Sequence, residues 1–189
     1  MATSDAVELE ISGKVVRITS PSKVFFPERG ETKLDLVEYY RAVEDAFLGA
    51  VGGRPTLLQR FPDGVGGSSF FQKRVPKGAP AWLRTTTMST PNGTTSNAMV
   101  LEDLAHVAWA VNMGCLGFHP WPCRADDPGT TDEVRIDLDP SPGVDFPMLR
   151  EARVETVKAR QARRVGAELA LAEKIRTAIS MIKGKENHV

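Results

Sequence analysis

The chain has 189 residues, 41% of them hydrophobic, which is typical of one globular domain with a buried core. Its 24 lysines and arginines balance 24 aspartates and glutamates, so no overall basic charge indicates nucleic-acid binding. Two cysteines without a C-x-x-C pattern indicate neither a zinc site nor a disulfide framework. No apolar run approaches a membrane span, and the N-terminus lacks a signal-peptide pattern, so we expect a soluble cytoplasmic protein.

The first half of the chain predicts antiparallel strands around one helix. Apolar and polar residues alternate over 7–18 on both sides of a short turn, which predicts a hairpin. Apolar residues then recur at helical spacing over 36–47, after Thr32 and Asp35, whose spacing resembles a capping box. Turn-forming sequences separate the further strands that we expect, at 56–61, 69–75, 83–88 and 94–100.

The second half predicts a helix at 104–111, a buried strand at 115–118 and a loop rich in tryptophan and proline at 119–128. Asp145 can cap a long helix that has Pro147 in its first turn. Basic residues outnumber acidic ones from residue 150 onward. Strands and helices do not alternate regularly, so we expect an α+β fold.

A pair of carboxylates lies two residues apart in the segment 134–140. On a strand, Asp137 and Asp139 would share one face, about 6–7 Å apart, with Ile136 and Leu138 on the other. Two like charges on one face repel unless a cation lies between them, and divalent metals fill this place in nucleotidyl transfer. A surface strand with two solvated aspartates explains this short pattern equally well.

Adjacent aromatic residues, Phe70 and Phe71, are followed closely by Lys73, Arg74 and Lys77. On a strand the two rings point to opposite faces, so at most one of them is in the core. An exposed phenylalanine beside cations suits stacking on a base while the cations contact phosphate. The alternative is an ordinary buried strand that runs into a solvated charged turn.

Four further residues are candidates for phosphate or nucleotide contacts. Lys33 lies in the first helical turn, where its charge opposes the helix dipole unless an anion is recruited, and Lys23 lies in the preceding loop. Either lysine alone also suits a solvated surface. Arg60 could bind a phosphate or pair with an acid, and a lone histidine such as His119 is more often structural than a ligand.

Taken in order, six blocks resemble the polymerase domain of bacterial DNA ligase D, a branch of the archaeo-eukaryotic primase superfamily. The blocks are 20–27, 32–40, Arg54-Pro55, 70–73, 118–122 and 135–140. The resemblance covers about residues 7–150. It implies primase-polymerase-like antiparallel sheets flanked by helices over 1–149, followed by a basic helical tail at 150–189.

The resemblance also implies roles for the residues that match the family's motifs. Asp137 and Asp139 would hold Mn²⁺ or Mg²⁺ against the triphosphate of a nucleotide. Lys23 and Lys33, with Ser20 where relatives often have asparagine, would form the pocket for the 5′-phosphate of the downstream strand at a break.

Phe70 and Phe71 would stack on the template near that phosphate, and Arg60 and His119 would approach the incoming nucleotide. The implied partners are DNA ends with a 5′-phosphate, nucleoside triphosphates, and end-joining proteins such as Ku or a ligase. The implied location is the cytoplasm, at the nucleoid, without membrane attachment.

The sequence departs from the family after the first metal motif. Relatives continue to a Ser-x-Lys-Gly-x-His-like motif and a third metal-binding aspartate, whereas here only His188 follows His119 and no aspartate follows Asp145. We therefore expect an incomplete second half. The expected function is a DNA end-joining nucleotidyltransferase that this departure impairs, and the alternatives are a non-catalytic module that binds 5′-phosphorylated ends or an inactive remnant.

Overall fold

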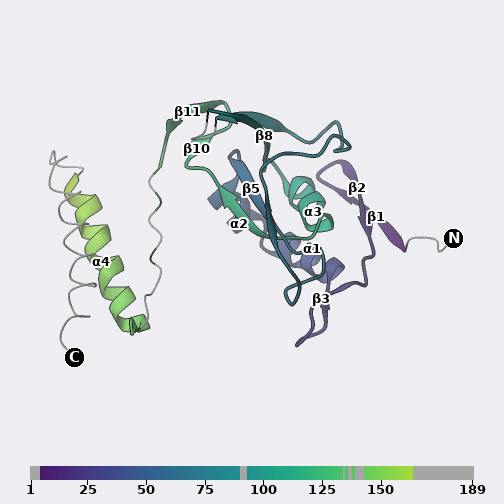
Figure 1. The fold of residues 1–189 in the computed structure, drawn as a ribbon, viewed down its shortest axis with the longest axis horizontal. Coiled ribbons are helices and arrows are strands. Elements are labelled where there is room, and N and C mark those ends of the chain that lie inside the picture. The colour runs from purple at the N-terminus through teal and green to yellow at the C-terminus, as the bar shows by residue number, and fades with distance from the viewer. Residues whose placement is uncertain (1–4, 90–92, 134, 136–137, 139–142, 164–189) are drawn as a thin grey trace. The chain divides into compact units, whose positions relative to one another are not determined.

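The computed structural model describes residues 5–89, 93–133, 135, 138 and 143–163, with side chains to residue 157 (Figure 1). The chain divides into two compact units, residues 1–134 and 135–189. The architecture is α+β with antiparallel pairing, as the sequence predicts. No helix in the described part of the chain is long and apolar enough to cross a membrane.

The first unit begins with the predicted hairpin, β1 (Ala6–Ile11) and β2 (Lys14–Thr19). Ser12 and Gly13 join the strands with φ of 51° and 70°, the left-handed conformation that a two-residue hairpin turn needs. Val16 and Ile18 are buried on one face of β2, which packs against α3 (Leu104–Asn112).

A short ribbon of β3 (Val24–Phe26) and β4 (Glu31–Thr32) leads into α1 (Lys33–Ala42). Thr32 caps this helix and forms the predicted capping box with Asp35. The prediction of one helix over 36–47 is wrong, because the chain breaks at Val43 and continues as α2 (Glu44–Val51). The break brings Phe47 within 4.9 Å of the Tyr40 ring, an aromatic contact that stabilises the bend.

A five-stranded antiparallel sheet forms the centre of the first unit. Its strands are β5 (Pro55–Arg60), β6 (Phe70–Gln72), β7 (Thr85–Ser89), β8 (Thr95–Val100) and β9 (Cys115–Pro120). The order is β6-β5-β8-β7, and β9 also pairs with β5. The predicted strands are confirmed, although β6 and β7 are shorter than expected. The sheet shares a core with α3, whose residues from Leu104 to Val111 are all buried.

The prediction of a loop over 119–128 is wrong in part. β9 extends to Pro120, and β10 (Cys123–Arg124) pairs with β11 (Asp127–Thr131). Backbone bonds from Trp121 N to Pro55 O (2.8 Å) and from Ala125 N to Gly53 O (3.0 Å) hold this segment beside the entrance to β5. These tertiary bonds keep a proline-rich sequence extended.

The second unit contains α4 (Phe146–Arg163). The predicted cap is confirmed, because the Met148 amide donates a hydrogen bond to Asp145 Oδ1 at 2.9 Å. Asp137 and Asp139, and most of the strand expected at 134–140, lie outside the described residues.

Candidate nucleic-acid interface

Lys23 and Lys33 belong to one small site at the start of α1. Lys23 Nζ donates hydrogen bonds to Pro62 O at 2.7 Å and to Asp63 Oδ1 at 3.0 Å. Lys33 is only 6% exposed, and its Nζ donates to Thr19 O at 2.5 Å. Both lysines therefore donate to groups of the first unit around the start of α1, and the 5′-phosphate pocket that the resemblance implies for them stays a prediction.

Backbone hydrogen bonds fix the loop between these lysines. The Lys33 amide donates to Lys23 O at 2.8 Å, and the Lys23 amide donates to Ser20 O at 3.0 Å. Ser20 is exposed and has a φ of 49°, a left-handed conformation that is uncommon for serine. The loop therefore holds Ser20 in a defined conformation at the rim of the site.

The electrostatics of this site favour an anion. Burial lowers the pKa of Lys33 below its ordinary value, and the charge of Lys23 lowers this pKa further. Among the described residues Lys33 forms no ion pair, and its ammonium group is offset by the Thr19 carbonyl oxygen and by the Phe25 ring, whose centre lies 6.0 Å away. A bound phosphate would raise the pKa of Lys33 again, because its negative charge would stabilise the ammonium group.

Phe70 and Phe71 are both exposed, at 46% and 54%, so the alternative of an ordinary buried strand is wrong. Phe70 pairs directly with Arg60 across β5 and β6, and the Arg60 guanidinium lies 5.1 Å from the Phe70 ring centre. This distance is within the range of a cation–π contact.

Arg60 does not pair with an acid among the described residues. Its Nε donates to Met113 O and its Nη1 donates to Gln72 Oε1, both at 2.6 Å. Burial lowers the pKa of Arg60, although the guanidinium stays charged. Arg60 is therefore a rigid cation that supports the exposed Phe70 ring.

The opposite face of the sheet carries Phe71 and His119. Register places Gln59 beside Phe71 and Leu57 beside His119, so all four side chains share one face. The Phe71 and His119 rings meet edge to face with centres 5.4 Å apart, and His119 Nε2 lies 3.4 Å from Gln59 Oε1. This arrangement is an exposed platform of two rings and one amide.

Gly117 keeps this platform open. A Cβ atom at Gly117 would lie 2.8 Å from Gln59 Oε1 and 2.9 Å from Gln59 Cβ, so the Gln59 side chain would have to shift. Sequence reasoning missed Gln59, Gln72 and Gly117, since their positions depend on pairing between strands far apart in the chain. The period-2 pattern of β5 was the available signal for Gln59.

The loop after β5 links the lysine site to the aromatic residues. This loop starts beyond Arg60, and its Pro62 and Asp63 accept the bonds from Lys23. Gly64 has a φ of 79° and is packed against Phe25, where a Cβ atom would lie 2.9 Å from the backbone oxygen. The sequence-predicted cations and aromatics of the first unit therefore flank one short, well-anchored loop.

A buried ion network holds the chain just before the D-x-D pair. Arg54, which is 3% exposed, donates to Asp132 Oδ1 at 2.6 Å, to Asp132 Oδ2 at 2.9 Å and to Glu133 Oε2 at 3.0 Å. Arg124 Nε adds a bond to Asp132 Oδ2 at 2.7 Å. Bonds from Arg54 and Arg124 hold the pKa of the Asp132 carboxyl well below its usual range.

Within the described ranges, no three histidine, cysteine, aspartate or glutamate side chains gather so that they could hold a metal. Asp137 and Asp139, the candidate ligands, are outside these ranges. Their assignment as metal ligands stays a prediction that rests on spacing and resemblance.

Comparisons with known proteins agree with the resemblance. A family model described as LigD, primase-polymerase domain, matches residues 32–177. The multifunctional non-homologous end joining protein LigD of Mycolicibacterium smegmatis is 32% identical over 138 residues, which cover 72% of this chain and 18% of that protein. The bifunctional LigD protein of Bacillus subtilis is 32% identical over 140 residues, 74% of this chain and 22% of that protein.

Among solved structures, the polymerase domain of Mycobacterium tuberculosis ligase D in complex with DNA matches with a TM-score of 0.66 and 28% identity. The match covers 79% of this chain and 54% of that one. The chain thus spans about a fifth of the length of these curated relatives. On the family match and the shared fold, the chain belongs to the LigD primase-polymerase domain family.

Proposed function

We propose that this chain binds 5′-phosphorylated DNA ends in non-homologous end joining and transfers nucleotides to them with Mn²⁺ or Mg²⁺. The observation that carries the proposal is the pair of coupled lysines, one of them buried and without an ion pair among the described residues. The names of the relatives, which are end-joining proteins, and the DNA-bound state of the solved relative support it.

In this proposal the lysine site binds the 5′-phosphate of the downstream strand. Lys33 and Lys23 would donate charge-assisted hydrogen bonds to phosphate oxygens, with Ser20 at the rim. Asp63 already pairs with Lys23, so an incoming phosphate must compete with an exposed carboxylate for that ammonium group. Lys33 is therefore the stronger contributor.

The exposed rings would position the template and the incoming nucleotide. Phe70 and Phe71 offer two ring faces on opposite sides of β6, and bases stack on such rings independently of their sequence. Arg60 holds Phe70 in place, and His119 lies against Phe71, where either could approach the nucleotide.

Asp137 and Asp139 would hold the divalent cation, which when bound neutralises charge on the triphosphate during nucleotidyl transfer. The Arg54 network would fix the chain that enters this segment. Calorimetry tests this part directly. Mn²⁺-dependent nucleotide binding should occur with the native chain and disappear with Asp137→Ala/Asp139→Ala, whereas equal binding by both would contradict the assignment.

The second candidate is a non-catalytic module that recognises 5′-phosphorylated ends. It is favoured by the buried Lys33 and its neighbour Lys23, which could bind a phosphate without any contribution from Asp137 and Asp139. It predicts a preference for phosphorylated over unphosphorylated recessed ends, lost on Lys23→Ala, with strong salt dependence and no nucleotide addition. Primer extension distinguishes the two candidates, since only the first yields product.

A further inference from the structure

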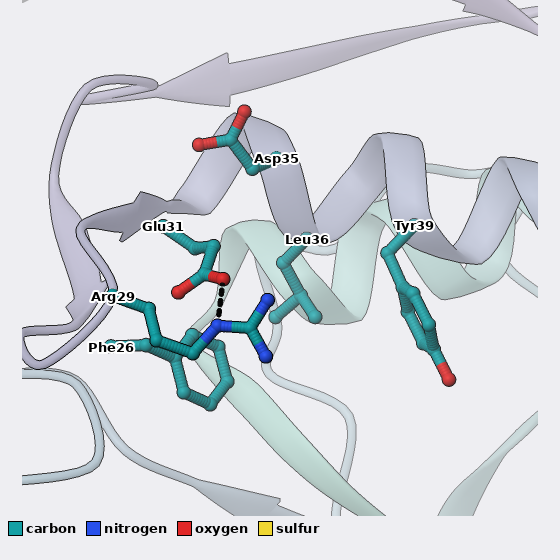
Figure 2. A pocket seen from close by; sticks show the side chains of 6 residues that line it. All are labelled: Phe26, Arg29, Glu31, Asp35, Leu36 and Tyr39. Atoms are coloured by element: carbon teal, nitrogen blue, oxygen red, sulfur yellow. Dashed lines mark ion pairs between the residues drawn. The ribbon is translucent and has the colours of Figure 1, made fainter.

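A pocket of about 290 Å³ lies beside the β3-β4 ribbon, and none of the residues proposed above for DNA or nucleotide contacts lines it. Residues from the ribbon and from α1 line it: Phe26, Arg29, Glu31, Asp35, Leu36 and Tyr39. Figure 2 shows the Arg29 guanidinium and Leu36 between the Phe26 and Tyr39 rings, with Glu31 above Arg29 and with Asp35 pointing away from them.

One oxygen in this pocket has an unmet hydrogen-bonding requirement. Glu31 Oε1 forms an ion pair with Arg29 Nε at 2.5 Å. Glu31 Oε2 is buried and has no hydrogen-bond partner among the described residues. A buried acceptor without a donor is costly, and more so when it is charged. A donor from outside the chain would remove that cost once the side chains that cover this oxygen, which has almost no accessible surface, move aside.

The local charge is negative. Asp35 is fully engaged in the capping box, where Thr32 N and Thr32 Oγ1 both lie 2.8 Å from its Oδ2, but it keeps its charge. Arg29 is 80% exposed, so its pairing with Glu31 is weak and easily displaced. The net negative charge of the lining residues disfavours a phosphate ligand, and this distinguishes the pocket from the lysine site.

The apolar residues of the pocket indicate that the ligand also has an apolar part. Phe26 and Leu36 form an apolar surface, and Tyr39, which is 58% exposed, offers a ring face that attracts cations. A long side chain with an aliphatic stem and a cationic end matches both features. The volume is at the lower limit for small-molecule sites and suits a single inserted side chain.

We infer that this pocket binds an arginine or lysine side chain of a partner polypeptide, next to an apolar residue of the same partner. The cation donates to Glu31 Oε2, and its stem lies against Leu36 and Tyr39. The partner would dock without covering the lysine site, so this interaction is independent of the proposed DNA binding.

A titration followed by ¹H–¹⁵N NMR of the full chain tests this inference. The probe is N-acetyl-Leu-Arg-Leu-amide, and its neutral counterpart carries citrulline in place of arginine. We expect saturable shifts confined to residues 26–39 with the arginine peptide. The citrulline peptide should bind about tenfold more weakly, because it loses one charge-assisted hydrogen bond.

Glu31→Gln should weaken binding of the arginine peptide by about the same factor. Glu38→Gln is the matched control, because Glu38 lies on α1 but pairs with Arg41 at 3.0 Å outside the pocket, and it should change nothing. Arg29→Ala should bind at least as tightly as the native chain, since it frees the second Glu31 oxygen. Absent shifts at 26–39, equal binding of both peptides, equal binding by Glu31→Gln, or lost binding in Arg29→Ala would each overturn the inference.

Discussion

Replacing Lys33 by methionine removes the buried ammonium group and keeps most of the aliphatic stem. The side chain is 6% exposed, so solvent screens its charge little. A charge-assisted hydrogen bond to phosphate contributes about 1.5–3 kcal/mol, which corresponds to about 10- to 150-fold in affinity. Lys33→Met should reduce the preference for a 5′-phosphorylated end by at least tenfold.

Fluorescence anisotropy with recessed duplexes, with and without the 5′-phosphate, measures this preference. Arg41→Met is the matched control, because it removes one cation from the exposed last turn of the same helix. It should weaken both duplexes slightly and leave their ratio unchanged. If Lys33→Met keeps the native ratio, the lysine site does not bind the 5′-phosphate.

Lys33 also predicts a pH dependence of stability. Burial lowers the pKa of Lys33 in the folded chain, so the Lys33 side chain holds its proton more tightly in the unfolded chain. The free energy of unfolding of the native chain should therefore rise, relative to that of Lys33→Met, as pH approaches 10.5. Parallel urea titrations check this. The pKa of Asp132 is depressed in the folded chain, so the native chain should lose stability relative to Asp132→Asn as pH falls below 3.8. If acid titrations show the same difference in free energy of unfolding between the two chains at every pH, the Arg54 network is contradicted. Arg54→Met should lower the free energy of unfolding by about 1–3 kcal/mol, because it removes the hydrogen bonds from the buried Arg54 to Asp132 and Glu133 while Arg124 still pairs with Asp132; an unchanged urea midpoint would refute this. Phe71→Ala should weaken single-stranded template binding by about 1–3 kcal/mol with little change in stability, as judged by anisotropy beside a thermal melt.

Features that depend on neighbouring residues were predictable from the sequence. The hairpin needs only alternation around Ser12-Gly13, and the first helix needs only the Thr32 capping box. The cap at Asp145 is equally local. In both caps the side chain and the backbone group that it satisfies lie three residues apart.

Features that depend on tertiary contacts were not predictable. The helix break at Val43 follows from packing of Phe47 against Tyr40 and Phe118. Likewise β10 and β11 form because the entrance to β5 supplies backbone acceptors, which no periodicity in 119–128 indicates.

The candidate site divides in the same way. The sequence identified its cations and aromatics, but the exposure of both Phe70 and Phe71 accompanies the place of β6 at the edge of the sheet, which depends on pairing with a distant strand. The contact between Phe71 and His119 depends on register across β5. Arg60 bonds a carbonyl oxygen and an amide oxygen and pairs with no acid among the described residues, and its approach to a phosphate stays a prediction.

Primer extension at a gapped duplex tests the central proposal most directly. With Mn²⁺ and nucleoside triphosphates, the native chain should add nucleotides, more efficiently when the downstream strand carries a 5′-phosphate. Asp137→Ala should abolish the product, and Lys33→Met should remove the phosphate dependence. No Mn²⁺-dependent product from a folded chain that binds these ends, or product that persists in Asp137→Ala, would contradict nucleotidyl transfer by this chain.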